Sequence, residues 1–209
     1  MRGFAKGMAW VGGILGVVVL LLYVFVVDTW ELPNDDPRLA TSVEPLLHAG
    51  DSLIIARRTG TSLGHLTRCP APDGSGYVVG RVAAVYGDTI TVTNGGMRIQ
   101  GRVGEPSRTC DVAKVSVKHP ANGEQVDLRC GVVELGRSTR ILFHPDLPQP
   151  ESTHVVESGK VFLLSDDRHF HYDSRDVGQI DPATCQDLYL RLWSAEGWSD
   201  GSSRLTGIW

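Results

Sequence analysis

The sequence predicts a mostly β domain of antiparallel strands that follows a single N-terminal transmembrane helix. Three observations lead to this prediction. The stretch from Gly7 to Val27 carries no charge. Short runs of β-type residues, separated by turn signals, fill most of the chain after residue 50, and residues 40–180 show no sustained helical periodicity. The length of 209 residues allows one anchor and one domain of ordinary size.

Residues 8–27 are predicted to form a transmembrane signal-anchor helix, because about 20 apolar residues cross the roughly 30 Å hydrocarbon layer as a helix. Arg2 and Lys6 precede this run and acidic residues follow it. The positive-inside rule therefore keeps residues 1–7 in the cytoplasm and places the later residues on the outer face. A cleaved secretory signal is the alternative, but the run is long for one and no small-x-small cleavage site follows it.

Residues 28–41 are expected to be an acidic, proline-punctuated tether, with Trp30 at the membrane interface. Residues 42–209 are assigned to the β domain, in which residues 104–137 are a variable, polar, strand-poor insertion. Asn94-Gly95 lies between two alternating runs, which indicates a hairpin. Residues 185–194 can form a helix or a last strand. The β-type runs lie at residues 52–57, 76–87, 89–101, 113–118, 139–144 and 160–165.

Composition excludes some partners and suggests disulfides. The net charge of −4 argues against nucleic acid, whose binding needs a basic surface. Four cysteines in an outward-facing domain fit two disulfides, although four unpaired thiols are the alternative. Cys110 and Cys130 are the preferred pair because both flank the insertion, and Cys69 and Cys185 are the other candidates. Their spacings do not match the CxxC pairs of metal sites.

Three segments carry polar motifs at intervals along the predicted domain. The first, residues 42–51, reads SVEPLLHAGD, and the second, residues 80–89, reads GRVAAVYGDT. The third, residues 165–178, reads SDDRHFHYDSRDVG. A proline and a Gly-Asp turn shorten the first segment into a loop that leads into a strand. Its hydroxyl, on Ser42, is thereby held at the edge of that loop.

In this order, and behind an anchor, the three segments resemble the type I signal peptidases, serine peptidase family S26. The first resembles the family pattern Ser-Met-x-Pro-Thr-Leu-x-x-Gly-Asp, in which the serine, here Ser42, is the nucleophile. The third resembles Gly-Asp-Asn-Arg-x-x-Ser-x-Asp-Ser-Arg-x-x-Gly, whose charged residues support the site. The resemblance gives this supporting role to Asp166, Arg168, Asp173, Ser174 and Arg175, and to Arg81 and Asp88 of the second segment.

The second segment departs from the family at its most important position. The family pattern is Lys-Arg-Val-x-Gly-x-Pro-Gly-Asp, in which the lysine is the general base, and Gly80 occupies the lysine position here. A serine hydroxyl is a poor nucleophile without a base, which typically contributes 10²–10⁴-fold to the rate. Ala40 is a second departure, because many family members have a serine there that helps to stabilise the oxyanion.

Three explanations of the missing lysine stay open. His171 falls where the family has a serine that orients the lysine, so His171 is the proposed substitute base, with Asp166 or Asp173 to orient its ring. A lysine from elsewhere, Lys114, Lys118 or Lys160, is the second explanation. The third is a catalytically inactive homologue that binds preproteins or acts as an accessory membrane protein.

The resemblance implies a membrane-bound serine endopeptidase that removes signal peptides from exported preproteins at the outer face of the cytoplasmic membrane. Such enzymes bind an extended segment by strand addition, with small side chains in shallow apolar pockets. Val43, Pro45 and Leu46 are the expected substrate-binding residues. The partners implied are preproteins and the lipid bilayer. Neither a cofactor nor a metal is implied, and the histidines show no ligand spacing such as HExxH.

Overall fold

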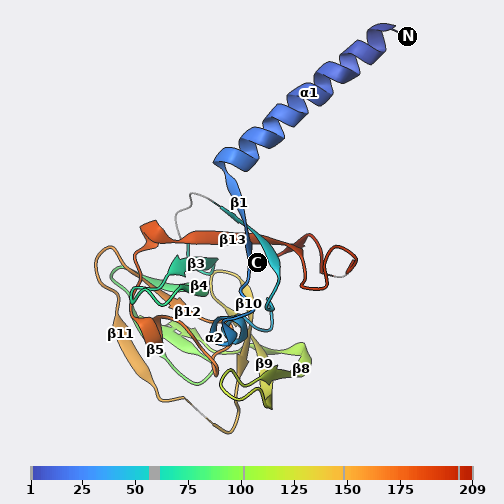
Figure 1. Cartoon of the computed structure of the whole chain (residues 1–209). Coiled ribbons are helices and arrows are strands. Elements are labelled where there is room, and N and C mark those ends of the chain that lie inside the picture. The colour runs from blue at the N-terminus through green and yellow to red at the C-terminus, as the bar shows by residue number, and fades with distance from the viewer. Residues whose placement is uncertain (1, 57–61, 101, 148, 202, 209) are drawn as a thin grey trace.

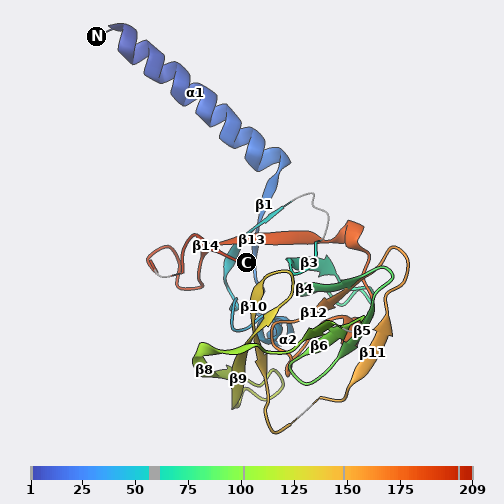
Figure 2. The same ribbon diagram turned by 180° about the vertical axis from the view of Figure 1, so that it is seen from behind.

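A long helix and a β domain make up the chain (Figure 1). The computed structural model describes all residues except 1, 57–61, 101, 148, 202 and 209. Helix α1 (Arg2–Phe25) projects away from the domain in both views (Figures 1 and 2). The other helices of the described residues are short: α2 (Pro37–Ser42), α3 (Ser174–Val177) and the 3-10 helix η1 (Pro182–Thr184).

The strands of the described residues form three antiparallel sheets, which confirms the mostly β fold class. A seven-stranded sheet has the order β1-β2-β13-β3-β4-β12, with β14 paired to β13. A three-stranded sheet has the order β10-β9-β8, and a four-stranded sheet the order β11-β5-β6-β7. The strands are β1 (Val27–Glu31), β2 (Ser52–Ala56), β3 (Leu66–Pro70), β4 (Tyr77–Val85), β5 (Thr89–Val92), β6 (Met97–Ile99), β7 (Arg102–Gly104), β8 (Arg108–Lys118), β9 (Gln125–Glu134), β10 (Ser138–Phe143), β11 (Ser152–Val155), β12 (Val161–Leu164), β13 (Gln186–Trp193) and β14 (Thr206–Gly207).

The expected tether at residues 28–41 is part of the folded domain instead. Strand β1 pairs with β2 from Val27↔Ala56 to Glu31↔Ser52. Leu32 follows it with an exposed fraction of 0%, in the core beneath this sheet. Asp36 then caps α2 by accepting a hydrogen bond from the Leu39 N–H at 3.0 Å. The acidic residues mark a strand edge and a helix cap, so the segment is ordered by pairing and burial.

The insertion at residues 104–137 was predicted to be strand-poor, and this prediction was wrong. Strands β8 and β9 form a long antiparallel hairpin, and β10 completes a sheet on β9. One face of the hairpin buries Val117 and Leu128 against Leu142 of β10. Burial of alternate apolar residues explains why a segment rich in charged residues still forms strands.

Other local predictions have clear outcomes. The Asn94-Gly95 turn joins β5 to β6, with Gly95 at a positive φ of 76°, as the hairpin prediction required. Residues 186–193 form strand β13, not a helix. Disulfides join Cys110 to Cys130 and Cys69 to Cys185, with Cα–Cα distances of 5.5 and 4.3 Å. The first is the pairing that the sequence favoured.

Helix α1 exposes its apolar side chains. All side chains from 10 to 21 are exposed, and they are apolar or glycine. Within the described part of the chain, no helix meets the length and hydropathy that crossing a membrane requires. The transmembrane assignment of residues 8–27 stays a prediction.

Candidate active site

Ser42, the nucleophile that the resemblance implies, ends helix α2 and is fully buried. Its exposed fraction is 0%. Its hydroxyl donates a hydrogen bond to the Leu39 carbonyl oxygen at 2.8 Å, a local bond that serine often makes within a helix. A carbonyl oxygen does not take up the proton as a general base does. The hydroxyl is therefore not activated in this arrangement.

The loop after Ser42 is held by packing and by one buried carboxylate. Val43 and Leu47 are buried in the core cluster of the first sheet. Asp51 accepts hydrogen bonds from the His48 N–H at 3.0 Å and from Arg191 Nη1 of β13 at 3.1 Å. The structure thus corrects the expected role of Val43, whose exposed fraction is 1%, because the core covers its side chain. The Val43 side chain faces this core cluster.

Gly80, at the position of the family's lysine, lies in β4 where the neighbouring strand leaves little room. A Cβ built there lies 3.0 Å from the Leu164 carbonyl oxygen and 3.2 Å from Leu163 Cβ. Val78 and Val82 belong to a buried apolar cluster that includes Leu163. A side chain at position 80 therefore requires the neighbouring backbone of β12 to give way by a few tenths of an ångström.

Arg81, the next residue, forms a buried ion pair with the third motif. Its Nε and Nη2 donate to Asp166 Oδ1 and Oδ2 at 2.8 and 3.1 Å, and its Nη1 donates to the Gly64 carbonyl oxygen at 3.0 Å. Both side chains are almost fully buried. This bidentate geometry fixes residue 166 to β4. Asp88 closes the turn after β4 by accepting from the Val85 N–H at 3.0 Å.

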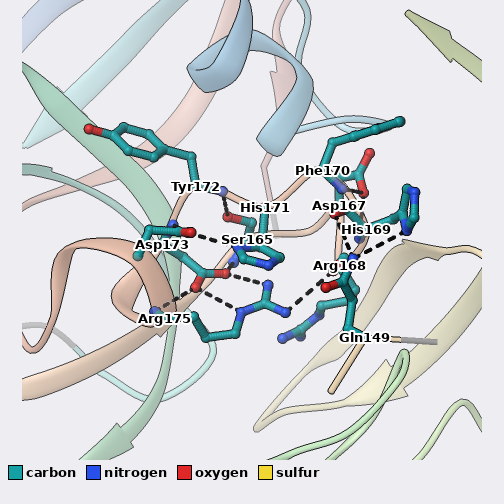
Figure 3. Close-up of polar contacts among 11 residues, drawn as sticks. Gln149, Ser165, Asp167, Arg168, His169, Phe170, His171, Tyr172, Asp173 and Arg175 are labelled. Carbon is teal, nitrogen blue, oxygen red and sulfur yellow. Dashed lines mark hydrogen bonds and ion pairs between the residues drawn. The ribbon is translucent and has the colours of Figure 1, made fainter. Parts of the chain in front are cut away.

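A second ion pair organises the far end of the same motif (Figure 3). Arg175 donates to both carboxylate oxygens of Asp173, at 2.9 and 2.7 Å. The Ser165 N–H donates to the same carboxylate at 2.8 Å. Burial acts to raise the pKa of Asp173, but the charge and hydrogen bonds of Arg175 outweigh it and hold the pKa well below its usual range. Ser174 accepts a hydrogen bond from the Leu163 N–H at 2.9 Å, which fastens α3 to β12.

His171, the proposed substitute base, pairs with Asp176 and not with Ser42. Its Nδ1 lies 2.7 Å from Asp176 Oδ2, and its side chain is 19% exposed. Neither Ser42 nor His171 has a hydrogen bond to the other in the described structure. The structure therefore does not bring the proposed nucleophile and the proposed base together. The Ser-His-Asp arrangement is absent from this geometry of the described residues, because the imidazole faces the carboxylate of Asp176 in α3.

Lys118 reaches the Ser42 loop from the insertion. Its carbonyl oxygen accepts a hydrogen bond from the Thr41 hydroxyl at 3.4 Å. Burial raises the pKa of Glu44 to about 7, and the charge of Lys118 offsets only part of this shift. Lys160, by contrast, lies in the turn that precedes β12, at the opposite end of that strand from Ser165. No side-chain hydrogen bond of Lys118 to Ser42 exists among the described residues.

Asp167 and Arg168 are buried with part of their hydrogen-bonding capacity unused. Asp167 Oδ1 accepts from the N–H groups of His169 and Phe170, both at 2.8 Å, whereas its Oδ2 has no partner among the described residues (Figure 3). Burial raises the pKa of Asp167 to about 7, and Glu44 adds to the rise. Arg168 Nε and Nη1 also lack partners there, and burial lowers its pKa to about 10. The Asp167 N–H donates to the Ser42 carbonyl oxygen at 3.0 Å, so these groups adjoin the nucleophile's backbone.

One group of side chains has the composition of a cation site. Ligand atoms of His171, Asp173 and Asp176 lie within 4.8 Å of one another. Both oxygens of Asp173 already accept from Arg175, whose positive charge opposes a metal ion at this point. The local charge balance therefore favours the arginine over a cation.

Comparison with protein families agrees with the three motifs. A family model described as signal peptidase, peptidase S26, matches residues 7–186. The chain belongs to this family. At the family level it is a peptidase of the serine type. Comparison with individual curated proteins gives no significant match.

Sequence reasoning missed the half-buried carboxyl group of Glu44 and the buried carboxyl group of Asp167. Glu44 occupies the variable position of the first family pattern, so no pattern singled it out. Asp167 stands where the family pattern has asparagine, and this departure was the available signal. The contact of Lys118 with Thr41 could not be predicted, because it depends on the fold of the insertion.

Gly80→Ala tests whether position 80 is closed to a side chain. We expect a loss of about 1–3 kcal/mol in the free energy of unfolding, the usual range for overpacking a core. Chemical denaturation of the full chain in detergent measures it. Gly201→Ala is the matched control, because only an Arg204 nitrogen lies within 4.0 Å of its Cβ position. An equal effect of both substitutions would refute the packing argument.

Asp167→Asn tests the buried carboxyl group. A carboxyl group whose pKa is raised by folding stabilises the native state only while protonated, so stability falls as the pH rises from about 4 towards 7. Asparagine does not titrate. We therefore expect the free energy of unfolding of the variant, relative to that of the parent, to be higher at pH 8 than at pH 5. The upper bound of this difference is about 3 kcal/mol, because only the interval from pH 5 to the pKa of about 7 contributes, at roughly 1.4 kcal/mol per pKa unit. Asp111→Asn, at an exposed position, serves as the control and should show no such difference.

Proposed function

We propose that this chain is a non-cleaving member of the signal peptidase family, which binds exported preproteins at the outer face of the cytoplasmic membrane. The proposal combines the family assignment with the state of the two catalytic positions. Hydrolysis needs a serine hydroxyl and a base within hydrogen-bond reach of each other. Binding of an extended segment needs only the scaffold.

One observation carries the proposal: the proton of the Ser42 hydroxyl is directed at a carbonyl oxygen, not at a base. The family's base position is a glycine whose Cβ site is crowded by β12. His171, the substitute base proposed from the sequence, is hydrogen-bonded to Asp176. Loss of the base alone removes a factor of about 10²–10⁴ from the rate.

The scaffold that supports the family's site is retained, which favours a function in binding over a loss of all function. The buried Arg81–Asp166 pair and the Asp173–Arg175 pair are both intact. Family members receive an extended segment by strand addition, so we propose the same mode for preproteins here. Pro45 and Leu46 are half-buried, and they are the residues of the first motif proposed to contact such a segment.

Membrane attachment by residues 8–27 is part of the proposal. Its support is the uncharged sequence from Gly7 to Val27 and the exposed apolar face of α1. Trp30 and Tyr77 also contact each other at the domain end of this helix, with ring centroids 6.0 Å apart. Arg68 lies over both rings, at 4.8 and 4.5 Å. Such aromatic and basic side chains are common at membrane interfaces.

A serine endopeptidase with a relocated base is the second candidate function. The retention of Ser42 and of the third motif favours it, since a working relative would keep both. Under this proposal Ser42 must turn away from Leu39 when a substrate binds, and a group such as His171 or Lys118 must approach it.

The experiment that separates the two uses the full chain in detergent with a preprotein carrying a signal peptide. We expect the chain to bind the preprotein without cleaving it. Ser42→Ala should bind the preprotein equally well, because the buried Ser42 hydroxyl is bonded to Leu39 and takes no part in binding. Mass spectrometry measures cleavage, and fluorescence anisotropy measures binding. The same preprotein without its signal peptide is the control for binding.

Cleavage that Ser42→Ala abolishes would refute the non-cleaving function and establish the endopeptidase. Cleavage lost in His171→Ala as well would identify the relocated base. Absence of both binding and cleavage would refute both candidates. Restoration of cleavage by Gly80→Lys alone is not expected, because the backbone of β12 crowds the Cβ position of residue 80.

A further inference from the structure

A cavity of about 370 Å³ lies between the three-stranded sheet and the first sheet. It shares Leu46 with the residues proposed to contact a preprotein, but most of its lining has no role in the proposed function. Strands β8, β9 and β10 supply Arg108, Val132 and Arg140 to its wall. The opposite wall includes Leu46 of the Ser42 loop and the buried pair of Arg81 and Asp166. In β4, Arg81 follows Gly80, so their side chains point to opposite faces of the strand. The cavity is therefore separate from the family's base position.

Strand register places two arginines on one face of the cavity. Arg108 of β8 pairs with Val132 of β9, and Arg140 of β10 pairs with the same valine. Directly opposed residues of neighbouring strands point to the same face. The two guanidinium groups therefore flank Val132, on Cα atoms about 10 Å apart, at roughly 4.8 Å per strand.

The charge of this wall is unbalanced. Among the described residues, neither Arg108 nor Arg140 makes a side-chain hydrogen bond or an ion pair, and both are exposed. Arg81 is neutralised by Asp166 at 2.8 Å. Three arginines and one aspartate thus leave a charge of +2 around the cavity, in a chain whose net charge is −4. Two free guanidinium groups match the charge of a phosphate dianion and present paired N–H donors to its oxygens.

The cavity also has an apolar part. Val132 is 7% exposed and Leu46 is half-buried. The volume exceeds what a single phosphate ion fills, because a water molecule occupies about 30 Å³. The lining therefore suits a phosphate with an organic substituent that contacts Leu46 and Val132.

We propose that this cavity is a binding site for a phosphate monoester or diester. Arg108 and Arg140 bind the phosphate group, and the organic substituent packs against Val132. The phosphate can belong to a soluble monoester, which is a dianion, or to a phospholipid headgroup, whose diester is a monoanion. The paired N–H donors of the two arginines bind the phosphate oxygens in both cases. The site does not depend on the proposed function, since it needs neither Ser42 nor a preprotein.

Calorimetric titration of the full chain in an uncharged detergent with phenyl phosphate tests the site, with inorganic phosphate as the second probe. We expect phenyl phosphate to bind more tightly than inorganic phosphate. Arg108→Gln with Arg140→Gln should weaken binding of both at least tenfold, because the charge-assisted contacts are lost. Arg98→Gln with Arg129→Gln removes two exposed strand arginines outside the cavity, and it should change the affinity less than twofold.

Nanodiscs of phosphatidylcholine, with and without phosphatidylglycerol, distinguish the two sources of phosphate. Weaker phenyl phosphate binding in phosphatidylglycerol, seen in the parent but not in the cavity variant, would assign the site to a lipid headgroup. Equal phenyl phosphate binding in both nanodiscs and in the uncharged detergent would assign it to a soluble phosphate compound, because phosphatidylcholine also carries a phosphodiester. Absence of phenyl phosphate binding up to about 10 mM, a free energy weaker than about −3 kcal/mol, would overturn the proposal. Equal weakening in the two arginine pairs would also overturn it, because only general charge attraction would then remain.

Discussion

The buried ion pair of Arg81 and Asp166 joins the second family motif to the third. Two N–H groups of the Arg81 guanidinium donate to the two oxygens of the Asp166 carboxylate, and a further N–H donates to the Gly64 carbonyl oxygen. Each charge of the pair therefore has a partner. Breaking such a buried pair costs on the order of 3–5 kcal/mol, because it leaves an uncompensated charge. The geometry of the whole site follows from this constraint.

Residues 166–168 connect separate elements around that pair. The Leu142 N–H of β10 donates to the Asp166 carbonyl oxygen, and the Arg168 N–H donates back to Leu142, at 2.9 and 2.7 Å. The Asp167 N–H donates to the carbonyl oxygen of Ser42. The same short segment thus positions β4, β10 and the end of α2. The scaffold of a peptidase site persists in this way although the hydroxyl of Ser42 is hydrogen-bonded to the Leu39 carbonyl oxygen.

Much of the fold could be predicted from the sequence, because local patterns determine it. Alternating apolar residues predicted the strands, Asn94-Gly95 predicted a hairpin, and the position of Cys110 and Cys130 around one segment suggested their pairing. The insertion and the residues after α1 were misjudged, because their charged residues lie on exposed faces of strands whose other faces are buried. The motifs singled out Arg81 and Asp166, which the fold brings together, whereas the catalytic roles of Ser42 and His171 stay predictions. The direction of the Ser42 hydroxyl, the pairing of His171 with Asp176 and the buried state of Asp167 were not predictable, because they depend on tertiary packing.

The state of Ser42 is tested most directly by its reaction with a fluorophosphonate, which modifies serine hydroxyls that a base activates. The intact mass of the full chain in detergent, followed by peptide mapping, reports an adduct, and Ser42→Ala controls for other serines. We expect no adduct at Ser42, because its hydroxyl is buried and bound to the Leu39 carbonyl oxygen. A stoichiometric adduct at Ser42, absent from Ser42→Ala, would show that the serine is activated and would contradict a non-cleaving function.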